Sequence, residues 1–500
     1  MDFYAQGLKL SAQGRHGEAI ERFEQALAAM PNDARTLFAL ANTARALGLD
    51  EAAEQFFRHV LALEPGRPEA TVNLANLMRA NGQFAAALAL LKPALARNPE
   101  AAELWLTLGS THREMDDADE ARRCYRQALA LKPNDAAALS NLADLAADDG
   151  AHEEALALYD GALAADPHAA QARLNRAILH LLRGELEQGW RDYAARLKLP
   201  GKVPAPDHDL PRWSGASLKR TRLLVTAEQG IGDQVMFASM IPGLCARAAD
   251  EGGHVLLECE PRLADLFARS FPHALVHAWA AEKREGVVRT HHGWLKQAGG
   301  ANRAIEMGSL PRFLRKSLQA FPFPHDYLIP DAMEQARWRG ALSRLPRPLI
   351  GICWRSGLKG GARAVQYAPL ESWAEFLRGV PATPVSAQYD AVPEEIAQLS
   401  ALSGRDIFVA PGIDQKHELD RAAALFSVLD AMVSAPTAVS WLAAAAGTTT
   451  LKVLYDTSWT SLGERHEPFA PAALCLMPRQ RGDWSDVFEQ AAEAIGSLRG

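Results

Sequence analysis

The sequence predicts a multidomain α + α/β protein, with an N-terminal α-solenoid followed by two Rossmann-like α/β lobes. Two observations predict this fold class. A set of alanine, aromatic and proline positions recurs every 34 residues through residues 1–199. Beyond residue 219, short apolar runs alternate with helical segments, as in parallel α/β layers. The length of 500 residues also exceeds what one hydrophobic core usually serves.

Each repeat has a leading alanine, an aromatic residue or leucine four positions later, and a closing proline. The alanines are Ala19, Ala53, Ala87, Ala121 and Ala155, and the prolines are Pro31, Pro65, Pro99, Pro133 and Pro167. A small residue twelve positions before each alanine lets two helices approach closely. Proline ends the second helix because it lacks an N–H group. These positions are the signature of the tetratricopeptide repeat (TPR). We expect five clear copies and one divergent sixth copy within residues 1–199.

Asparagines recur on the first helix of the repeat. Asn73, Asn141 and Asn175 share one register, and Asn42 and Asn76 share a second register three residues further on. An asparagine side chain both donates and accepts, so a column of asparagines on a concave solenoid surface suits the backbone of an extended peptide. The column is similar to the asparagine ladder of the TPR-bearing O-linked N-acetylglucosamine transferases. The alternative is that asparagine is simply tolerated on a hydrated face.

Composition narrows the classes of function. Hydrophobic residues make up 48% and charged residues 23% of the chain, which is typical of a folded protein. The net charge of −7 argues against nucleic acid as a partner. The five cysteines form no CxxC pair, and neither a secretory signal nor an apolar run of membrane-spanning length is present. We therefore expect a cytoplasmic protein without a disulfide framework or an integral membrane segment.

Residues 200–218 are rich in proline and predict an extended linker between the domains. Asp207-His208-Asp209 in this linker superficially matches the DxD metal motif of one glycosyltransferase fold. That motif belongs at the end of a strand, facing a nucleotide diphosphate, and not in a proline-rich connection. We therefore expect no metal site here.

The first lobe is expected over residues 219–335. Arg222 to Thr226 predicts a buried strand, which leads into the segment AEQGIGDQ at 227–234 and then a helix reaching Arg247. Gly230 and Gly232 allow a tight turn and a close backbone approach at the carboxyl end of the strand, where ligands of open α/β sheets bind. A second strand is expected over His254 to Glu258.

The second lobe is expected over residues 336–500. Its predicted strands are 349–354, 384–388, 407–409, 431–433 and 451–454. We expect a ligand cleft between the two lobes.

Several residues of the second lobe are candidates for binding a phosphate-bearing donor. Thr437 and Ala438 follow a strand and open a helix, where free N–H groups and the helix dipole favour an anion. Arg355, followed by Ser356, could pair with the same phosphate in a bidentate manner. Gln388 could reach a base or ribose, or could be an ordinary strand terminus.

At these positions the chain resembles the heptosyltransferase family and, more distantly, the O-linked N-acetylglucosamine transferases. The resemblance covers nearly the whole chain, and its carriers are Gly189-Trp190, 211–213, 227–233, 308–311, 354–357 and 434–447. It implies a GT-B fold in which the N-terminal lobe takes the acceptor, the C-terminal lobe takes a nucleotide-sugar, and no metal or other cofactor is required.

The resemblance also places a catalytic aspartate at Asp233, as the general base that takes the proton of an acceptor hydroxyl. An acid in the first turn of a helix can equally be a structural cap. Two departures alter the phosphate side of the site, because Pro436 stands where many relatives carry aspartate and Trp441 where they carry histidine.

We therefore expect a metal-independent GT-B glycosyltransferase that transfers sugar from a nucleotide-sugar to Ser or Thr of a protein recruited by the TPR groove. Relatives of this kind modify flagellin, which makes flagellin a candidate acceptor. One alternative is a TPR adaptor whose glycosyltransferase domain no longer catalyses. Another is a transferase that acts on a saccharide or glycolipid acceptor.

Overall fold

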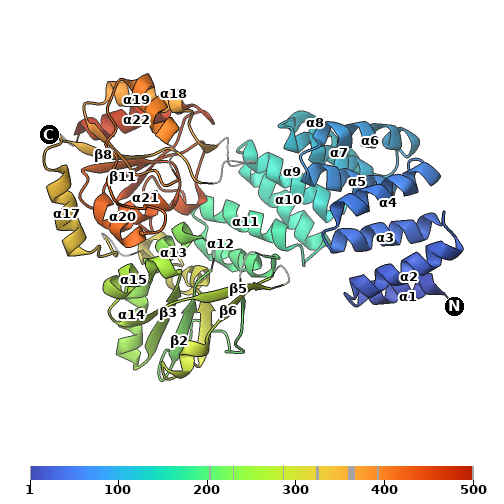
Figure 1. Cartoon of the computed structure of the whole chain (residues 1–500), viewed down its shortest axis with the longest axis horizontal. Helices are drawn as coiled ribbons and strands as arrows, with labels where there is room; N and C mark the ends of the chain where they lie inside the picture. Colours follow the sequence, from blue (N-terminus) through green and yellow to red (C-terminus); the bar gives the residue numbers. More distant parts are fainter. Residues whose placement is uncertain are drawn as a thin grey trace. The chain divides into compact units, whose positions relative to one another are not determined.

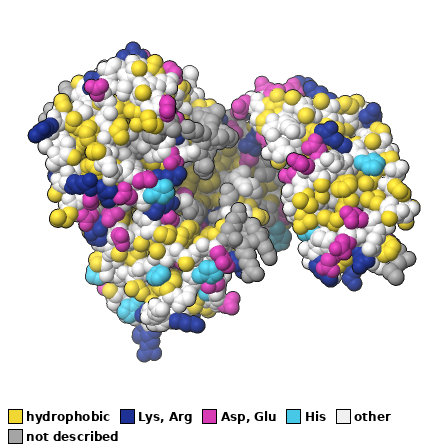
Figure 2. All heavy atoms as spheres, viewed as in Figure 1, with side chains coloured by type: hydrophobic (Ala, Val, Ile, Leu, Met, Phe, Trp, Pro, Cys, Tyr) yellow, Lys and Arg dark blue, Asp and Glu magenta, His cyan; other side chains and the backbone are white. Residues whose placement is uncertain are grey.

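The computed structural model describes residues 2–201, 204–228, 230–284, 287–321, 326–357, 366–390 and 393–497 (Figure 1). The chain forms two compact units, Met1–Asn175 and Arg176–Gly500. Within the described ranges, no helix has the length and apolar character needed to cross a membrane. On the face drawn in Figure 2, basic and acidic side chains lie interspersed over both units, consistent with a net charge of only −7.

The first unit is built of helical hairpins, one for each repeat. Its helices are α1 (Phe3–Ala12), α2 (His16–Ala29), α3 (Ala34–Ala46), α4 (Asp50–Leu63), α5 (Pro68–Ala80), α6 (Phe84–Arg97), α7 (Ala102–Glu114), α8 (Ala118–Leu131), α9 (Ala136–Asp148), α10 (His152–Ala165) and the first part of α11 (Ala170–Leu182). In all five hairpins the second helix ends two residues before the closing proline of the repeat, which confirms the predicted role of that proline.

Close helix approach inside a hairpin depends on the predicted small residues. A Cβ atom at Gly7 would lie 2.5 Å from a ring carbon of Phe23, and one at Gly109 would lie 2.7 Å from a ring carbon of Tyr125. Both aromatic side chains are fully buried. The aromatic ring of the second helix therefore fills the space that a side chain at the glycine of the first helix would occupy.

The second unit begins with the end of α11, followed by α12 (Leu186–Tyr193) and the 3₁₀ turn η1 (Ala194–Lys198). The proline-rich segment after it packs on the first lobe. Its short strand β1 (Ala205–Pro206) pairs with β6 (Val287–His291), which also pairs with β5 (Ala280–Arg284). Trp213 and Leu218 of the same segment are buried.

The first lobe is a four-stranded parallel sheet in the order β4-β3-β2-β7. The strands are β2 (Arg222–Thr226), β3 (His254–Cys259), β4 (Ala274–Ala278) and β7 (Arg303–Glu306). The accompanying helices and 3₁₀ turns are α13 (Ile231–Ala238), α14 (Ile241–Glu251), η2 (Pro261–Leu263), α15 (Ala264–Ser270), η3 (Gly293–Lys296), η4 (Met307–Ser309), α16 (Pro311–Leu314) and η5 (Leu318–Ala320).

The single helix predicted from the glycine loop to Arg247 is wrong, because α13 ends at Ala238 and α14 begins at Ile241. Pro242 occupies the first turn of α14, where its missing N–H group is tolerated. The break makes α13 only eight residues long.

The second lobe is a five-stranded parallel sheet in the order β12-β11-β10-β8-β9. Its strands are β8 (Leu349–Cys353), β9 (Thr383–Ser386), β10 (Ala431–Ser434), β11 (Thr450–Val453) and β12 (Ala473–Leu476). Its helices and 3₁₀ turn are α17 (Ala332–Leu342), α18 (Leu370–Gly379), α19 (Pro393–Ser403), α20 (Leu419–Phe426), α21 (Ala438–Ala445), η7 (Trp459–Ser461) and α22 (Trp484–Ser497). The strand predicted at 407–409 is reduced to one bridge between Phe408 and Val385.

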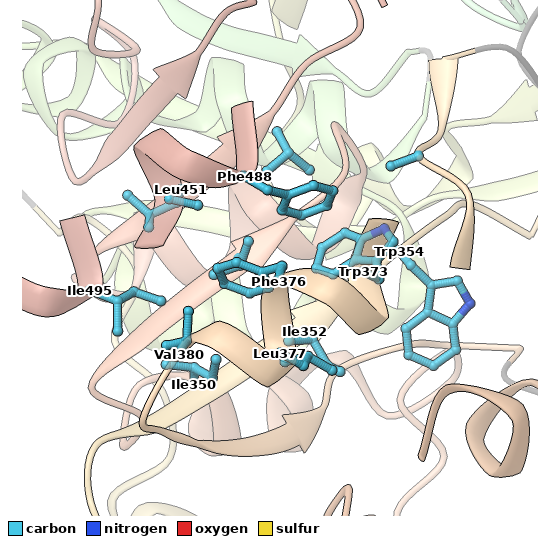
Figure 3. Packing of buried hydrophobic residues seen from close by; sticks show 14 of the residues in the cluster. Ile350, Ile352, Trp354, Trp373, Phe376, Leu377, Val380, Leu451, Phe488 and Ile495 are labelled. Carbon is cyan, nitrogen blue, oxygen red and sulfur yellow. The ribbon is translucent and has the colours of Figure 1, made fainter. Parts of the chain in front are cut away.

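An aromatic core lies between this sheet and the helices α18 and α22 (Figure 3). The ring of Phe488 lies 5.0 Å from that of Trp373 and 5.2 Å from that of Phe376, measured between centroids. Ile350 and Ile352 of β8 pack below these rings and are fully buried. This core holds β8 and β10 in place, and the candidate donor residues follow those two strands.

Candidate functional site

The glycine loop connects the carboxyl end of β2 to α13. Gly230 is the N-cap of α13, and its N–H donates to Oδ2 of Asp233 at 3.2 Å, so the Asp233 carboxylate caps the start of the helix. Gln229 lies outside the described residues. Of the two roles predicted for Asp233, the structure shows the helix cap. The Asp233 carboxylate is only partly buried.

The N-terminal turns of α13 and α21 meet at Gly232. A Cβ atom there would lie 3.5 Å from Cα of Ala438 and 3.3 Å from Cδ1 of Trp441. The first turn of α13, from one lobe, therefore packs directly on the backbone of α21, from the other lobe. Two helix N-termini, each following a parallel strand, are brought to the same place.

Thr437 caps α21 and links it to β8. Its Oγ1 accepts from the N–H of Val439 at 3.3 Å and lies 3.6 Å from Sγ of Cys353. Ala438 is the first residue of the helix, so its N–H group has no helical acceptor. The predicted pair Thr437 and Ala438 thus lies at a helix N-terminus, beside the end of β8.

Trp441 covers a buried ion pair behind this helix. Nζ of Lys452 lies 4.3 Å from the centroid of the Trp441 ring and pairs with the carboxylate of Glu467. Both charged side chains are almost completely buried. The indole therefore separates the charge of Lys452 from the glycine loop.

Arg355 is engaged by a carboxylate of its own chain. Its Nε donates to both oxygens of Glu395 at 3.1 and 2.9 Å, and its Nη2 donates to Oε2 at 2.5 Å. Nη1 and Nη2 also donate to the carbonyls of Ser356 and Asp390. A phosphate at this guanidinium would have to compete with Glu395.

Gln388 shapes the turn after β8. Its Oε1 accepts from the N–H groups of Trp354 and Arg355 at 2.9 and 3.0 Å. Its Nε2 donates to the carbonyls of Arg355 and Tyr389 at 2.8 and 2.7 Å. Since an amide has two acceptor sites and two donor hydrogens, this side chain already meets its hydrogen-bonding capacity. The structure brings all five predicted donor residues together, with Arg355 and Gln388 bonded to their neighbours.

A buried ion pair that the sequence did not suggest joins η1 to the first lobe. Nη2 of Arg196 lies 2.5 Å from Oε1 of Glu228, and the two side chains are 3% and 1% exposed. Glu228 also accepts from the N–H of Gly308 at 2.6 Å, and Arg196 donates to Oγ of Ser309 at 2.8 Å. A Cβ atom at Gly308 would lie 2.6 Å from Glu228 Oε1, so the glycine is needed here.

A histidine, His292, lies between two carboxylates near the sheet edge that carries Glu228. Nδ1 of His292 lies 2.7 Å from Oδ1 of Asp207, and Nε2 lies 3.2 Å from Oε1 of Glu258. Burial opposes a charge on this imidazole, but the two carboxylates outweigh burial and raise the pKa of His292. The Asp207 of the DxD-like triplet is thus bonded to a histidine.

The predicted asparagine column forms contacts between repeats. Nδ2 of Asn73 donates to Asn42 at 2.9 Å, and Nδ2 of Asn175 donates to Asp144 at 2.8 Å. Nδ2 of Asn141 likewise lies 3.4 Å from Oγ of Ser110. Each contact spans 31 residues, from one register to the other in the preceding repeat. Oδ1 of Asn76 accepts from Arg79 at 2.7 Å, and the asparagine side chains are half-buried.

Sequence models of the tetratricopeptide repeat match residues 10–74, 51–103, 106–170 and 153–198. The N-terminal region consists of tetratricopeptide repeats. The match to residues 153–198 includes the divergent sixth repeat.

Protein FlbA of Caulobacter vibrioides (strain ATCC 19089 / CIP 103742 / CB 15) is 34% identical over 323 residues, which cover 64% of this chain. The chain matches only about half of that relative's length, 54%. Among solved structures, the TPR protein TTC0263 of Thermus thermophilus is 31% identical, with a TM-score of 0.32 over 36% of this chain and 97% of its own. MamA is 25% identical, with a TM-score of 0.29 over 33% of this chain and 96% of its own.

Proposed function

We propose that this protein is a metal-independent GT-B-type glycosyltransferase. Its TPR unit recruits a polypeptide, and its α/β unit transfers a sugar from a nucleotide-sugar to a Ser or Thr hydroxyl of that polypeptide. Flagellin is one candidate acceptor. The first lobe takes the acceptor and the second lobe takes the donor.

The packing of Gly232 on the first turn of α21 is the observation that supports this proposal most. Two helix N-termini from two parallel α/β lobes meet there, and the Gly232 position lies close to Cα of Ala438 and Cδ1 of Trp441. N-terminal N–H groups and helix dipoles stabilise phosphate oxygens. A nucleotide diphosphate is the leaving group that such a pair of helix ends suits best.

In the transfer step, the start of α21 stabilises the leaving group and the start of α13 supplies the base. The acceptor hydroxyl oxygen bonds to the anomeric carbon while the bond from that carbon to the phosphate oxygen breaks. The electron pair leaves with the nucleotide, where the N–H group of Ala438 and the hydroxyl of Thr437 stabilise the new charge. Asp233 takes the hydroxyl proton, and its capping bond to Gly230 holds the carboxylate in place.

The second candidate is a TPR adaptor whose α/β unit no longer catalyses. This candidate is favoured by the bonds of Arg355 to Glu395 and by the saturated amide of Gln388. Both leave fewer hydrogen-bonding groups available to a sugar donor. Pro436 and Trp441 favour it for the same reason.

Nucleotide binding by calorimetry tests the donor site. The full chain is titrated with uridine, guanosine, adenosine and cytidine nucleotides and their sugars, with Gly232→Val, Thr437→Val and Asp233→Asn alongside. Gly243→Val is the matched control, because a Cβ atom at Gly243 meets no atom within 4 Å. We expect one nucleotide to bind, Gly232→Val and Thr437→Val to weaken it at least tenfold, and Asp233→Asn to abolish transfer while keeping binding. If no nucleotide binds the folded chain, the donor-site assignment fails and the adaptor becomes the better interpretation.

A saccharide or glycolipid acceptor is separated from a protein acceptor by truncation. The cut belongs after residue 175, because Arg196 of η1 is buried within the second unit and a cut at 200 would remove it. A saccharide acceptor should still be modified by residues 176–500. A protein acceptor recruited by the repeats should no longer be modified at an appreciable rate.

A further inference from the structure

Arginines recur at one register near the end of the first helix of the repeat. Arg45, Arg79 and Arg113 stand in the last turns of α3, α5 and α7, each 34 residues from the next. The first helices of successive repeats contact one another, as α5 contacts α7, and they form the inner row of the solenoid. The three arginines therefore stand at equivalent positions of three successive first helices, the helices that line the concave face of a TPR solenoid.

Two of these arginines are paired with an acid 35 residues further on. Arg79 binds Glu114 in a bidentate manner, with Nε donating at 3.0 Å and Nη2 at 2.7 Å. Arg113 lies 3.8 Å from Asp148, and it also donates to Asp144 at 2.6 Å. The repeat thus builds an ion-pair ladder between neighbouring first helices.

The ladder is incomplete at Arg45. The residue 35 positions further on is Ala80, which is exposed and offers no acceptor. The side-chain carbonyl of Asn42, the counterpart of the Asn76 carbonyl that Arg79 uses, accepts from Asn73 and not from Arg45. The guanidinium of Arg45 is exposed and has no partner in the part of the chain that the structure describes.

We propose that Arg45 is the docking point for an Asp or Glu side chain of an extended polypeptide on the inner face of the TPR unit. The missing group is the carboxylate that Glu114 supplies one repeat further along, so a partner carboxylate would complete the ladder. Charge-assisted bonds to a planar guanidinium favour a carboxylate over neutral amides. The inference rests on the proposal that the TPR unit recruits a polypeptide, and it is independent of sugar transfer.

The ion-pair ladder also suggests a substitution that would block the site intramolecularly. Ala80→Glu places an acid at the position of Glu114 and should occupy Arg45 intramolecularly. Arg45→Gln removes the cation instead. Arg126→Gln is the matched control, because Arg126 is exposed on α8, a second helix of its repeat. All three substitutions change the net charge from −7 to −8, so a difference between them cannot come from net charge.

The experiment uses the full chain and 12-residue peptides selected from a random phage library, then measured by fluorescence anisotropy. We expect the selected peptides to share an acidic residue whose replacement by its amide weakens binding at least tenfold. Arg45→Gln and Ala80→Glu should abolish that preference, and Arg126→Gln should keep it. The proposal is overturned if no peptide binds, if binding does not depend on the acid, or if Ala80→Glu binds like the unsubstituted chain.

Nucleotide titration of the same variants separates this outcome from the donor-site proposal. Arg45→Gln and Ala80→Glu lie in the TPR unit and should leave any nucleotide affinity unchanged. Loss of the acidic preference with nucleotide binding retained supports the docking point and the donor site separately. Nucleotide binding without any peptide binding overturns only the docking point.

Discussion

Replacing Glu228 by glutamine tests the buried network of the second unit most directly. Glu228 accepts from Arg196 at 2.5 and 3.1 Å and from the N–H of Gly308 at 2.6 Å, and its side chain is 1% exposed. Glutamine keeps the shape but removes the charge, and its NH₂ group must face the guanidinium in either orientation, and the Gly308 N–H as well in one of them. Removing one partner of a buried pair costs about 3–5 kcal/mol. We therefore expect Glu228→Gln to destabilise the second unit by about this amount.

Urea denaturation followed by tryptophan fluorescence measures the loss. The ring of Trp190 packs on that of Tyr193 at 5.7 Å, and Tyr193 lies 4.6 Å from the guanidinium of Arg196, so the probe is close to the change. With a slope of about 1–3 kcal/mol per molar urea, the midpoint should fall by at least about 1 M. Glu187→Gln is the control, because Glu187 forms an exposed pair with Arg191 whose loss costs about 1 kcal/mol or less.

The double variant Arg196→Met with Glu228→Leu distinguishes an unpaired charge from lost shape. Replacing both charges by apolar groups should recover most of the stability. The N–H of Gly308 would still lose its acceptor, which costs about 1–3 kcal/mol, so recovery should be partial. A midpoint for Glu228→Gln within about 0.3 M of the unsubstituted chain, or strictly additive single effects, would refute the reasoning.

Three further predictions concern other contacts. Gly109→Ala should destabilise the TPR unit by about 1–3 kcal/mol, because its Cβ meets the Tyr125 ring. Gly161→Ala should stabilise the unit by up to about 1 kcal/mol, because its Cβ meets no atom closer than 3.6 Å. Thermal melts measure whether the melting temperature falls in the first variant and rises in the second. The raised pKa of His292 means that the folded state holds the proton more tightly than the unfolded state. The stability that this proton provides at low pH should therefore be lost as the pH rises above 6.5. Thermal melts between pH 6 and 9 should show this fall in stability, and His292→Gln should remove it. Asn175→Ala should cost more than Asn73→Ala, about 1.5–3 against 0.5–1.5 kcal/mol, because Asn175 donates to a carboxylate and Asn73 to an amide; urea midpoints measure the difference.

The fold was largely predictable where one residue type recurs for a steric reason. The helices of the TPR unit follow from the proline and small-residue positions, because each position has one geometric task in every repeat. The buried strands β2, β3, β8, β10 and β11 follow from continuous apolar runs. In contrast, β5 reads AAEKR, and no apolar pattern identifies a strand at the edge of a small sheet.

The charged contacts of the candidate site could not be predicted in the same way. Glu228 stands beside the glycine loop and reads as a solvent-facing acid, yet its partner Arg196 lies 32 residues earlier and at the end of the repeats. Pairing of buried charges depends on the tertiary approach of separate elements, and no local period indicates it.

The contacts of Arg355 and Gln388 change which positions decide between an enzyme and an adaptor. Arg355 belongs to a segment that resembles a glycosyltransferase, and Gln388 is a predicted donor residue at a strand end, but the side chains of both hold the turn after β8 in shape. Retaining them is therefore compatible with a chain that needs only the fold. The contact at Gly232 joins α13 to α21 and takes no part in the turn after β8, and a larger residue there would press on Cδ1 of Trp441 and Cα of Ala438. A loss of nucleotide binding in Gly232→Val at unchanged stability would thus favour the transferase, whereas the same loss in Arg355→Ala would not distinguish a ligand contact from a collapsed turn.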